Sequence, residues 1–174
     1  RFTVQFPEKR EFFLEGQGIF SFGGISTSRF LATNPVPDDI PLLFFSRRIG
    51  LNGGYDVPID VGGRLTGKVG AYSIGVIDIR TGDSADAGVD ATNFGVVRVK
   101  RDILRRSAVG VLVTDRSMSS TGSGRSRAYG VDGTFAFFQN LSVNTYFAKT
   151  DNPEQAGHDT SYRAQVDYNG DRYG

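Results

Sequence analysis

The chain of 174 residues has no cysteine and a single histidine, and these two absences exclude several kinds of site. Without cysteine, neither a disulfide framework nor a thiolate metal centre can form. One histidine, His158, supplies neither a catalytic triad nor a zinc site by itself, and its polar neighbours favour a solvated loop position. We therefore expect no metal and no cofactor.

Charge of one sign and long apolar runs are missing as well. The 20 Lys and Arg residues nearly balance the 19 Asp and Glu residues, so no bulk field would recruit nucleic acid. No apolar run approaches the roughly 20 residues that a transmembrane helix needs, which excludes an inner-membrane span. With 23 glycines, 12% aromatic residues and 6 prolines, the composition favours strands and tight turns over helices.

Three stretches near the end of the chain alternate apolar and polar residues with a period of two: Arg127–Phe138, Leu141–Lys149 and Ser161–Asn169. A strand of a transmembrane barrel needs this pattern over about ten residues, because one face meets lipid and the other meets water. The residues predicted to face lipid or the aromatic girdles are Tyr129, Val131, Phe135, Phe137, Val143, Phe147, Tyr162, Val166 and Tyr168. The outward band also takes in Val109, Val111, Val113 and Ala164.

Upstream of these stretches, further strands are predicted at residues 61–69, 71–80, 93–101 and 106–115. Short turns between them alternate with long polar loops, as in barrels whose periplasmic turns are brief and whose outside loops are longer. The pattern in 71–80 leaves two alternatives open. Tyr72, Ile74 and Val76 share a face with Asp78, so either a bulge reverses the register near Val76 or the strand leaves the membrane there.

The fold class expected is all-β: an antiparallel transmembrane β-barrel, built as a meander of about eight to ten strands that is part of a larger barrel. Residues 1–57 would supply entry strands and a loop, including strands at Thr3–Phe6, Gly18–Phe22 and Leu42–Arg47. Residues 58–174 would form the regular meander. Because Arg1 is not followed by a basic start and an apolar core, we expect a piece of a longer protein with its export signal upstream.

Charged residues that alternate along the strands are predicted to face the lumen. A charge on the lipid face near the midplane costs roughly 2–4 kcal/mol, which makes the opposite face the favoured one. The candidates are Arg64, Lys68, Arg98, Lys100, Asp132, Arg163 and Asp167. Such residues could line an anion-selective lumen or hold the phosphates of lipopolysaccharide. Arg101, Asp102, Arg105 and Arg106 are better explained as caps of a periplasmic turn.

A dense charge cluster near the start of the chain contains Glu8, Lys9 and Arg10, with Glu11 and Glu15 after them. Paired carboxylates could serve glycoside hydrolysis, but that chemistry needs defined separations and a sugar-shaped cleft. An ion-pair network that plugs the barrel or fixes its first turn is the favoured interpretation. No catalytic residue is assigned, and a role as an enzyme is the less favoured one.

Two stretches, Phe6–Gly16 and Phe45–Leu51, carry a resemblance to a known family; the second contains Arg47 and Arg48. The chain resembles a bacterial outer-membrane β-barrel family of unknown function, whose barrel usually follows a domain similar to family-nine carbohydrate-binding modules. Further matching stretches occur, in the expected order, at 63–70, 97–102 and 129–132. The module is missing, and the barrels of that family are longer than this chain.

The resemblance implies a place in a Gram-negative outer membrane and a channel, receptor or surface-display role linked to carbohydrate uptake or binding. The expected partners are outer-membrane lipids and lipopolysaccharide, with carbohydrate as a further one and no nucleic acid. Two alternatives stay open at this point: a soluble β-sandwich carbohydrate-binding domain, and an outer-membrane polysaccharide hydrolase.

Overall fold

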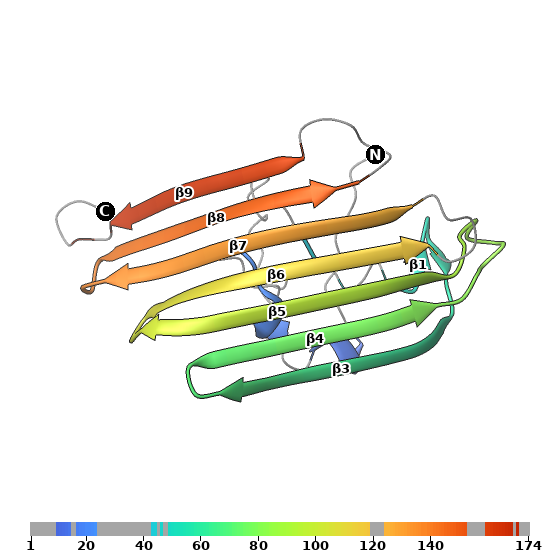
Figure 1. Cartoon of the computed structure of the whole chain (residues 1–174), viewed down its shortest axis with the longest axis horizontal. Coiled ribbons are helices and arrows are strands. Elements are labelled where there is room, and N and C mark those ends of the chain that lie inside the picture. The colour runs from blue at the N-terminus through green and yellow to red at the C-terminus, as the bar shows by residue number, and fades with distance from the viewer. Residues whose placement is uncertain are drawn as a thin grey trace.

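In the computed structural model, the residues described are 10–14, 17–23, 43–44, 46, 49–118, 124–152, 159–168 and 170. They form one antiparallel sheet of seven strands, in which each strand pairs with its neighbour in sequence (Figure 1). The strands are β3 (Ile59–Val69), β4 (Tyr72–Thr81), β5 (Thr92–Leu104), β6 (Ser107–Met118), β7 (Arg125–Phe137), β8 (Leu141–Asp151) and β9 (Thr160–Tyr168). The all-β antiparallel meander predicted from the alternation is confirmed.

The sheet is open in the part of the chain that the structure describes, because β3 and β9 each pair along one edge. Its strands number seven, where eight to ten were expected. Two further strands, β1 (Leu51–Asn52) and β2 (Tyr55–Asp56), form a small separate hairpin. Gly53 and Gly54 turn that hairpin with φ values of 60° and 94°, which a residue with a side chain adopts rarely.

One predicted turn is shorter than expected. Residues 102–105 were expected to connect β5 and β6, yet β5 continues to Leu104, which pairs with Ser107 after a register shift. The connection is thereby reduced to Arg105 and Arg106. The register shift between Asp102 and Leu104 adds one unpaired residue to β5. Because that residue breaks the alternation of apolar and polar side chains, the sequence pattern predicted too early an end for the strand.

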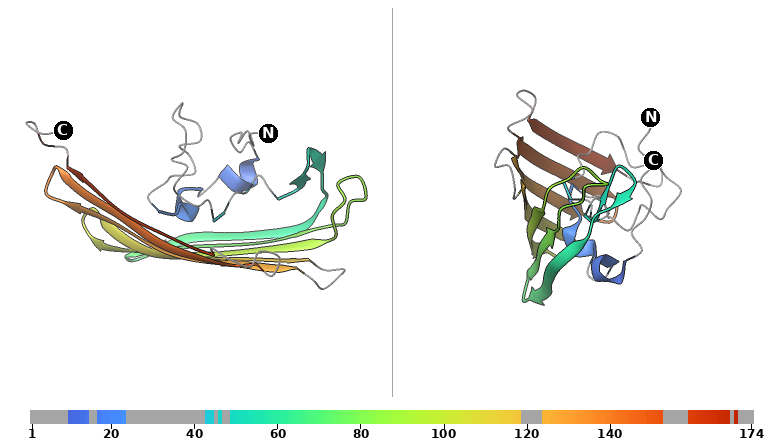
Figure 2. Two further views of the ribbon diagram at one scale, coloured as in Figure 1. Left: turned by 90° about the horizontal axis from the view of Figure 1, so that it is seen from above. Right: turned by 90° about the vertical axis from the view of Figure 1, so that its right-hand side faces the viewer.

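The segment before the sheet contains two short helical stretches, and the predicted strand at Gly18–Phe22 is wrong. The stretches are a short α-helix, α1 (Glu11–Leu14), and a 3-10 helix, η1 (Gln17–Phe20). The predicted strand at Thr3–Phe6 lies outside the described residues. Figure 2 shows the sheet curved like a trough, with both helical turns on its concave side. The aromatic residues of this segment meet the sheet through their side chains, so a strand pairing is not required to bury them. No described helix is both long and apolar enough to cross a lipid bilayer.

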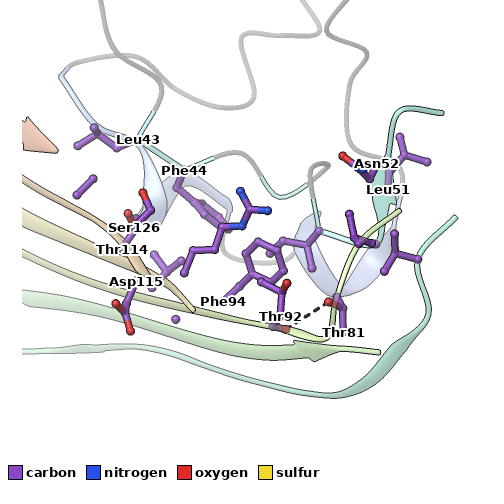
Figure 3. A pocket seen from close by; sticks show the side chains of 18 of the residues that line it. Leu43, Phe44, Leu51, Asn52, Thr81, Thr92, Phe94, Thr114, Asp115 and Ser126 are labelled. Atoms are coloured by element: carbon purple, nitrogen blue, oxygen red, sulfur yellow. Dashed lines mark hydrogen bonds between the residues drawn. The ribbon is translucent and has the colours of Figure 1, made fainter. Parts of the chain in front are cut away.

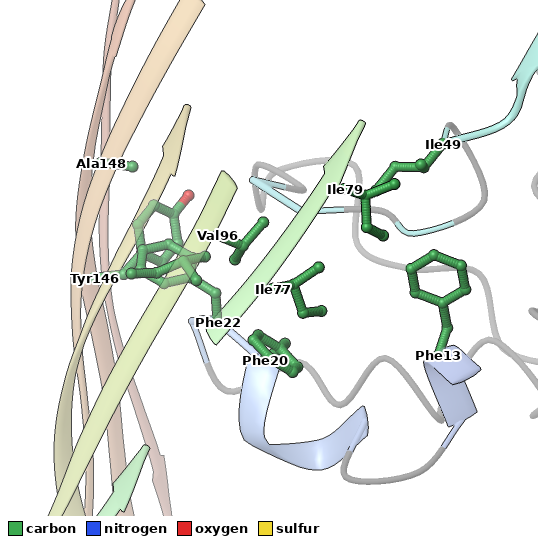
Figure 4. Close-up of a cluster of buried hydrophobic side chains, with 10 residues drawn as sticks. Phe13, Phe20, Phe22, Ile49, Ile77, Ile79, Val96, Tyr146 and Ala148 are labelled. Atoms are coloured by element: carbon green, nitrogen blue, oxygen red, sulfur yellow. The ribbon is translucent and has the colours of Figure 1, made fainter. Parts of the chain in front are cut away.

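The core lies between this segment and the concave face (Figure 4). Phe13, Phe20 and Phe22 come from the segment and are each at most 6% exposed. They belong to one cluster with residues of the sheet: Ile77, Ile79, Val96, Leu112, Tyr146 and Ala148. Burying apolar side chains of this size contributes about 1.5–3 kcal/mol each relative to water. The segment is therefore an integral layer of the fold.

The strand register settles the ambiguity in β4. Its pairing with β5 runs from Tyr72 to Thr81 without a shift, so no bulge reverses its faces near Val76. Ile77 and Ile79 point to the concave side, where they contact the buried cluster. Asp78 lies on the convex side, in the row that also contains Asp115 and Arg127. The apolar run of β4 on the convex face thus ends at Asp78, while the exit of the strand from a membrane stays a prediction.

Candidate functional site

The concave face carries the charged side chains that the sequence analysis predicted to face a lumen. Directly paired residues of an antiparallel sheet share a face, so the register alone places them. One row crosses all seven strands, in the order Lys68, Ser73, Lys100, Gly110, Asp132, Tyr146 and Arg163. Arg64, Arg98 and Asp167 lie on the same side in other rows. All seven charged residues singled out in the sequence therefore share the concave face, while their contact with a lumen stays a prediction.

Two of the seven form a buried ion pair at the centre of this face. Arg98 Nη1 donates to Asp132 Oδ1 at 2.6 Å, and Nη2 donates to Oδ2 at 2.8 Å. The Arg98 side chain is 0% exposed and that of Asp132 is 9% exposed. A bidentate arginine–carboxylate pair is geometrically specific, and each charge buried without its partner would carry a desolvation penalty of several kcal/mol.

A glycine makes the geometry of this pair possible. Arg98 is on β5 and Asp132 is on β7, so the arginine must cross β6, where Gly110 lies. A Cβ atom added to Gly110 would come within 2.8 Å of Arg98 Nη1. Any larger residue at this position would occupy the space that the guanidinium needs. In the sequence Gly110 is visible as a glycine within the apolar run 109–113, but the reason for it is a contact between strands.

The N-terminal segment closes over the ion pair. The backbone N–H of Gly23 donates to Asp132 Oδ2 at 3.2 Å, and Arg98 Cζ lies 5.9 Å from the centre of the Phe22 ring. The Phe22 ring also packs 5.6 Å from that of Tyr146. Asp132 thus bonds both to the sheet and to the segment. No local pattern of residues indicates this contact, because it joins residues 109 positions apart.

Two more glycines of the concave face receive phenylalanine rings from the segment. A Cβ atom on Gly75 would approach Phe20 Cζ to 2.7 Å, and one on Gly130 would approach the Phe22 ring to 2.5 Å. Both distances are shorter than a real Cβ atom would tolerate, so only glycine leaves room for the rings. We call these two positions, Gly75 and Gly130, the sockets of the concave face. The concave face is shaped to hold this segment at specific points.

The charged motif residues at the start of the chain are only partly described. Arg10 donates to the carbonyl oxygens of Ile49 at 2.7 Å and Ser46 at 2.9 Å, and its guanidinium lies 4.3 Å from the Phe13 ring centre. The Arg10 side chain thus links the motif region Phe6–Gly16 to the backbone of the motif region Phe45–Leu51. The other predicted motif residues lie outside the described residues: Glu8, Lys9, Arg47 and Arg48.

The sheet has a loop end, where long connections join β4 to β5, β6 to β7 and β8 to β9, and a turn end, where short connections join the other pairs. A cavity of about 640 Å³ opens beside the segment, at the loop end of the concave face (Figure 3). Its lining mixes apolar residues, such as Leu43 and Phe44, with the hydroxyl residues Thr114 and Ser126. Arg116 also lines it, with its guanidinium 5.7 Å from the Phe94 ring centre. The mixed lining suits a small polar molecule better than a hydrocarbon. Among the described residues, no group of three or more His, Cys, Asp or Glu side chains is placed to hold a metal ion.

The convex face carries the opposite chemistry. The nine residues predicted to face lipid or a girdle all lie on it, by their pairing with one another and with Val109, Val111 and Val113. Many of its large side chains are exposed, among them Leu65 at 69%, Tyr162 at 79% and Val166 at 66%. Their contact with lipid stays a prediction. Exposed apolar side chains that lie side by side in this way mark a surface that contacts a partner or a membrane in other proteins.

Comparisons of the chain with protein-family models, with curated proteins and with solved structures found no match. The resemblance to an outer-membrane barrel family therefore stays a prediction that rests on the sequence motifs.

Proposed function

We propose that this chain is a segment of a transmembrane β-barrel in a Gram-negative outer membrane, with the convex face toward lipid and the concave face toward the lumen. The observation that carries the proposal is the apolar convex face, which continues across all seven strands. One row of it reads Gly67, Ile74, Val99, Val111, Val131, Phe147 and Tyr162. In lipid this face needs no cover, whereas in water it would need a second layer of protein.

The extent of the apolar band supports this orientation. On β7 it runs from Tyr129 to Phe137, about nine residues, which is close to the length that a tilted strand needs to cross a bilayer. At the loop end it is bordered by Asp115, which accepts hydrogen bonds from Arg125 at 2.8 Å and Arg127 at 3.1 Å. Such a charged border matches the position of the membrane–water interface.

The proposed role is a receptor or a gated passage, because the N-terminal segment occupies the concave side. The segment is fixed there by the Gly23–Asp132 hydrogen bond and by the sockets at Gly75 and Gly130. An unobstructed pore would leave the buried Arg98–Asp132 pair in water. The proposed link to carbohydrate rests on the sequence resemblance. The proposed contact with lipopolysaccharide rests on the exposed apolar face.

Fractionation of cells that produce the full-length protein tests the proposal. We expect the protein in the outer-membrane fraction, soluble only with detergent, and with a mobility on gels that changes when the sample is heated. A protein that stays in solution without detergent would instead support the β-sandwich alternative and would refute the barrel.

A further inference from the structure

The two ends of the convex face differ in how their charges are balanced. At the loop end, Arg125 and Arg127 share the carboxylate of Asp115, and Lys149 Nζ lies 3.7 Å from Asp159 Oδ2. At the turn end, Arg101, Arg105 and Arg106 form no ion pair with any residue that the structure describes. The turn end therefore carries positive charge that no acidic side chain among the described residues neutralises.

The acid nearest in sequence does not supply that anion. Asp102 follows Arg101 directly, but its Oδ2 atom is 2.8 Å from Lys68 Nζ on the concave side. Alternation of the strand puts the two neighbours on opposite faces. Arg101 is thus left on the convex face, with its guanidinium 5.3 Å from the centre of the Tyr72 ring.

A shallow apolar groove of about 450 Å³ begins beside Arg101. Its floor is at Gly133 and Thr145, small residues in the same row as Arg101 and Val109. The Phe135 ring lies over Gly133, where an added Cβ atom would approach it to 2.7 Å, and Phe147 follows Thr145 by two residues along β8. The groove thus has a cation at one end and an apolar lining along its length. The cation suits the phosphate of a phospholipid, and the apolar lining suits its acyl chain.

We propose that this groove binds one anionic glycerophospholipid, with its phosphate at Arg101 and an acyl chain against the Phe135 and Phe147 rings. The proposal rests on the proposed function, since it requires the convex face to lie in a bilayer. Among the described residues, Arg101 is the one basic residue that lines the groove, since Arg105 and Arg106 line a separate pocket with Lys100, Asp102 and Asp132 of the concave face. The charge asymmetry assigns the lipid to the leaflet on the side of the short turns, and it distinguishes this site from general contact with lipid.

Native mass spectrometry of the full-length protein in detergent tests the site, with phosphatidylglycerol and phosphatidylcholine as probes. We expect phosphatidylglycerol to be retained preferentially and Arg101→Gln to weaken its binding about fivefold, the effect of one basic residue at an anionic membrane surface. Arg80→Gln is the matched control, because Arg80 is on the convex face of the neighbouring strand at the loop end, where the groove does not reach. It should retain wild-type binding.

A second variant tests the acyl part of the site separately. Gly133→Val places a side chain on the floor of the groove, where an added Cβ already comes within 2.7 Å of the Phe135 ring. It should reduce binding of phosphatidylglycerol while leaving Arg101 in place. Competition by soluble glycerophosphoglycerol equal to that of the lipid would overturn the acyl assignment, and preference for lipopolysaccharide would overturn the leaflet assignment.

The outcomes separate this proposal from the barrel itself. A protein that enters detergent micelles and membranes but binds phosphatidylglycerol equally well with and without Arg101 contradicts the lipid site alone. A protein that is soluble without detergent contradicts the barrel, and the lipid site with it.

Discussion

At the scale of single residues, Asp132 has the largest consequence, because it satisfies two parts of the fold at once. Its carboxylate binds the Arg98 guanidinium and the Gly23 backbone N–H. We expect Asp132→Asn to lower the free energy of unfolding by about 3–5 kcal/mol, since it leaves the fully buried Arg98 charge without a counter-charge. Urea unfolding of the detergent-solubilised protein measures this.

Asp102→Asn is the matched control for that variant. It also removes an ion pair between a basic and an acidic side chain, but the Lys68 and Asp102 side chains are 62% and 47% exposed. An exposed pair contributes about 0–1 kcal/mol, so the loss should be small. Equal losses in the two variants would show that the Arg98–Asp132 pair is not buried as described.

At the scale of elements, the strands were predictable and the N-terminal segment was not. A strand such as β9 has a strict alternation, and every exposed residue of it lies on one face. Each strand of the meander is also followed by its own pairing partner, so local pattern and tertiary structure agree. The segment instead buries Phe13, Phe20 and Phe22 against strands far away in sequence. Its phenylalanines alternate as strand residues do, and local alternation contains no information on the distant surface that buries them.

The same limit applies to the site. Alternation was enough to put Arg98 and Asp132 on one face, since face is a local property of a strand. It could not show that they pair across Gly110, or that Gly130 is a socket, because these contacts depend on register between strands. Glycine on the polar face of a strand is the signal that, in retrospect, marks both positions.

The contact between the segment and the sheet can be tested at Gly130. We expect Gly130→Ala to destabilise the protein by about 1–3 kcal/mol, because the new Cβ would meet the Phe22 ring at 2.5 Å and must displace it. Gly67→Ala is the control, as nothing lies within 4 Å of a Cβ there. Thermal unfolding of both variants decides, and equal stability would mean that Phe22 does not occupy this socket.

At the scale of the whole molecule, the structure has two faces of opposite chemistry on one curved sheet. The concave side carries the charged row and the helical turns of the N-terminal segment, and the convex side carries the exposed apolar rows (Figure 2). We assign water and the N-terminal segment to the concave face, and lipid to the convex face. The proposed place of the protein in a membrane depends on this assignment.

Cysteine labelling of the membrane-embedded protein tests that assignment most directly, since the chain has no native cysteine. Val131→Cys lies on the convex face, where the native side chain is 49% exposed, and Lys68→Cys lies on the concave face near the turn end. We expect the cysteine at 131 to react with a lipid-phase probe and to resist a water-soluble maleimide, and the cysteine at 68 to do the reverse. Reaction of the cysteine at 131 with the water-soluble reagent alone, or of that at 68 with the lipid-phase probe alone, would contradict the assignment.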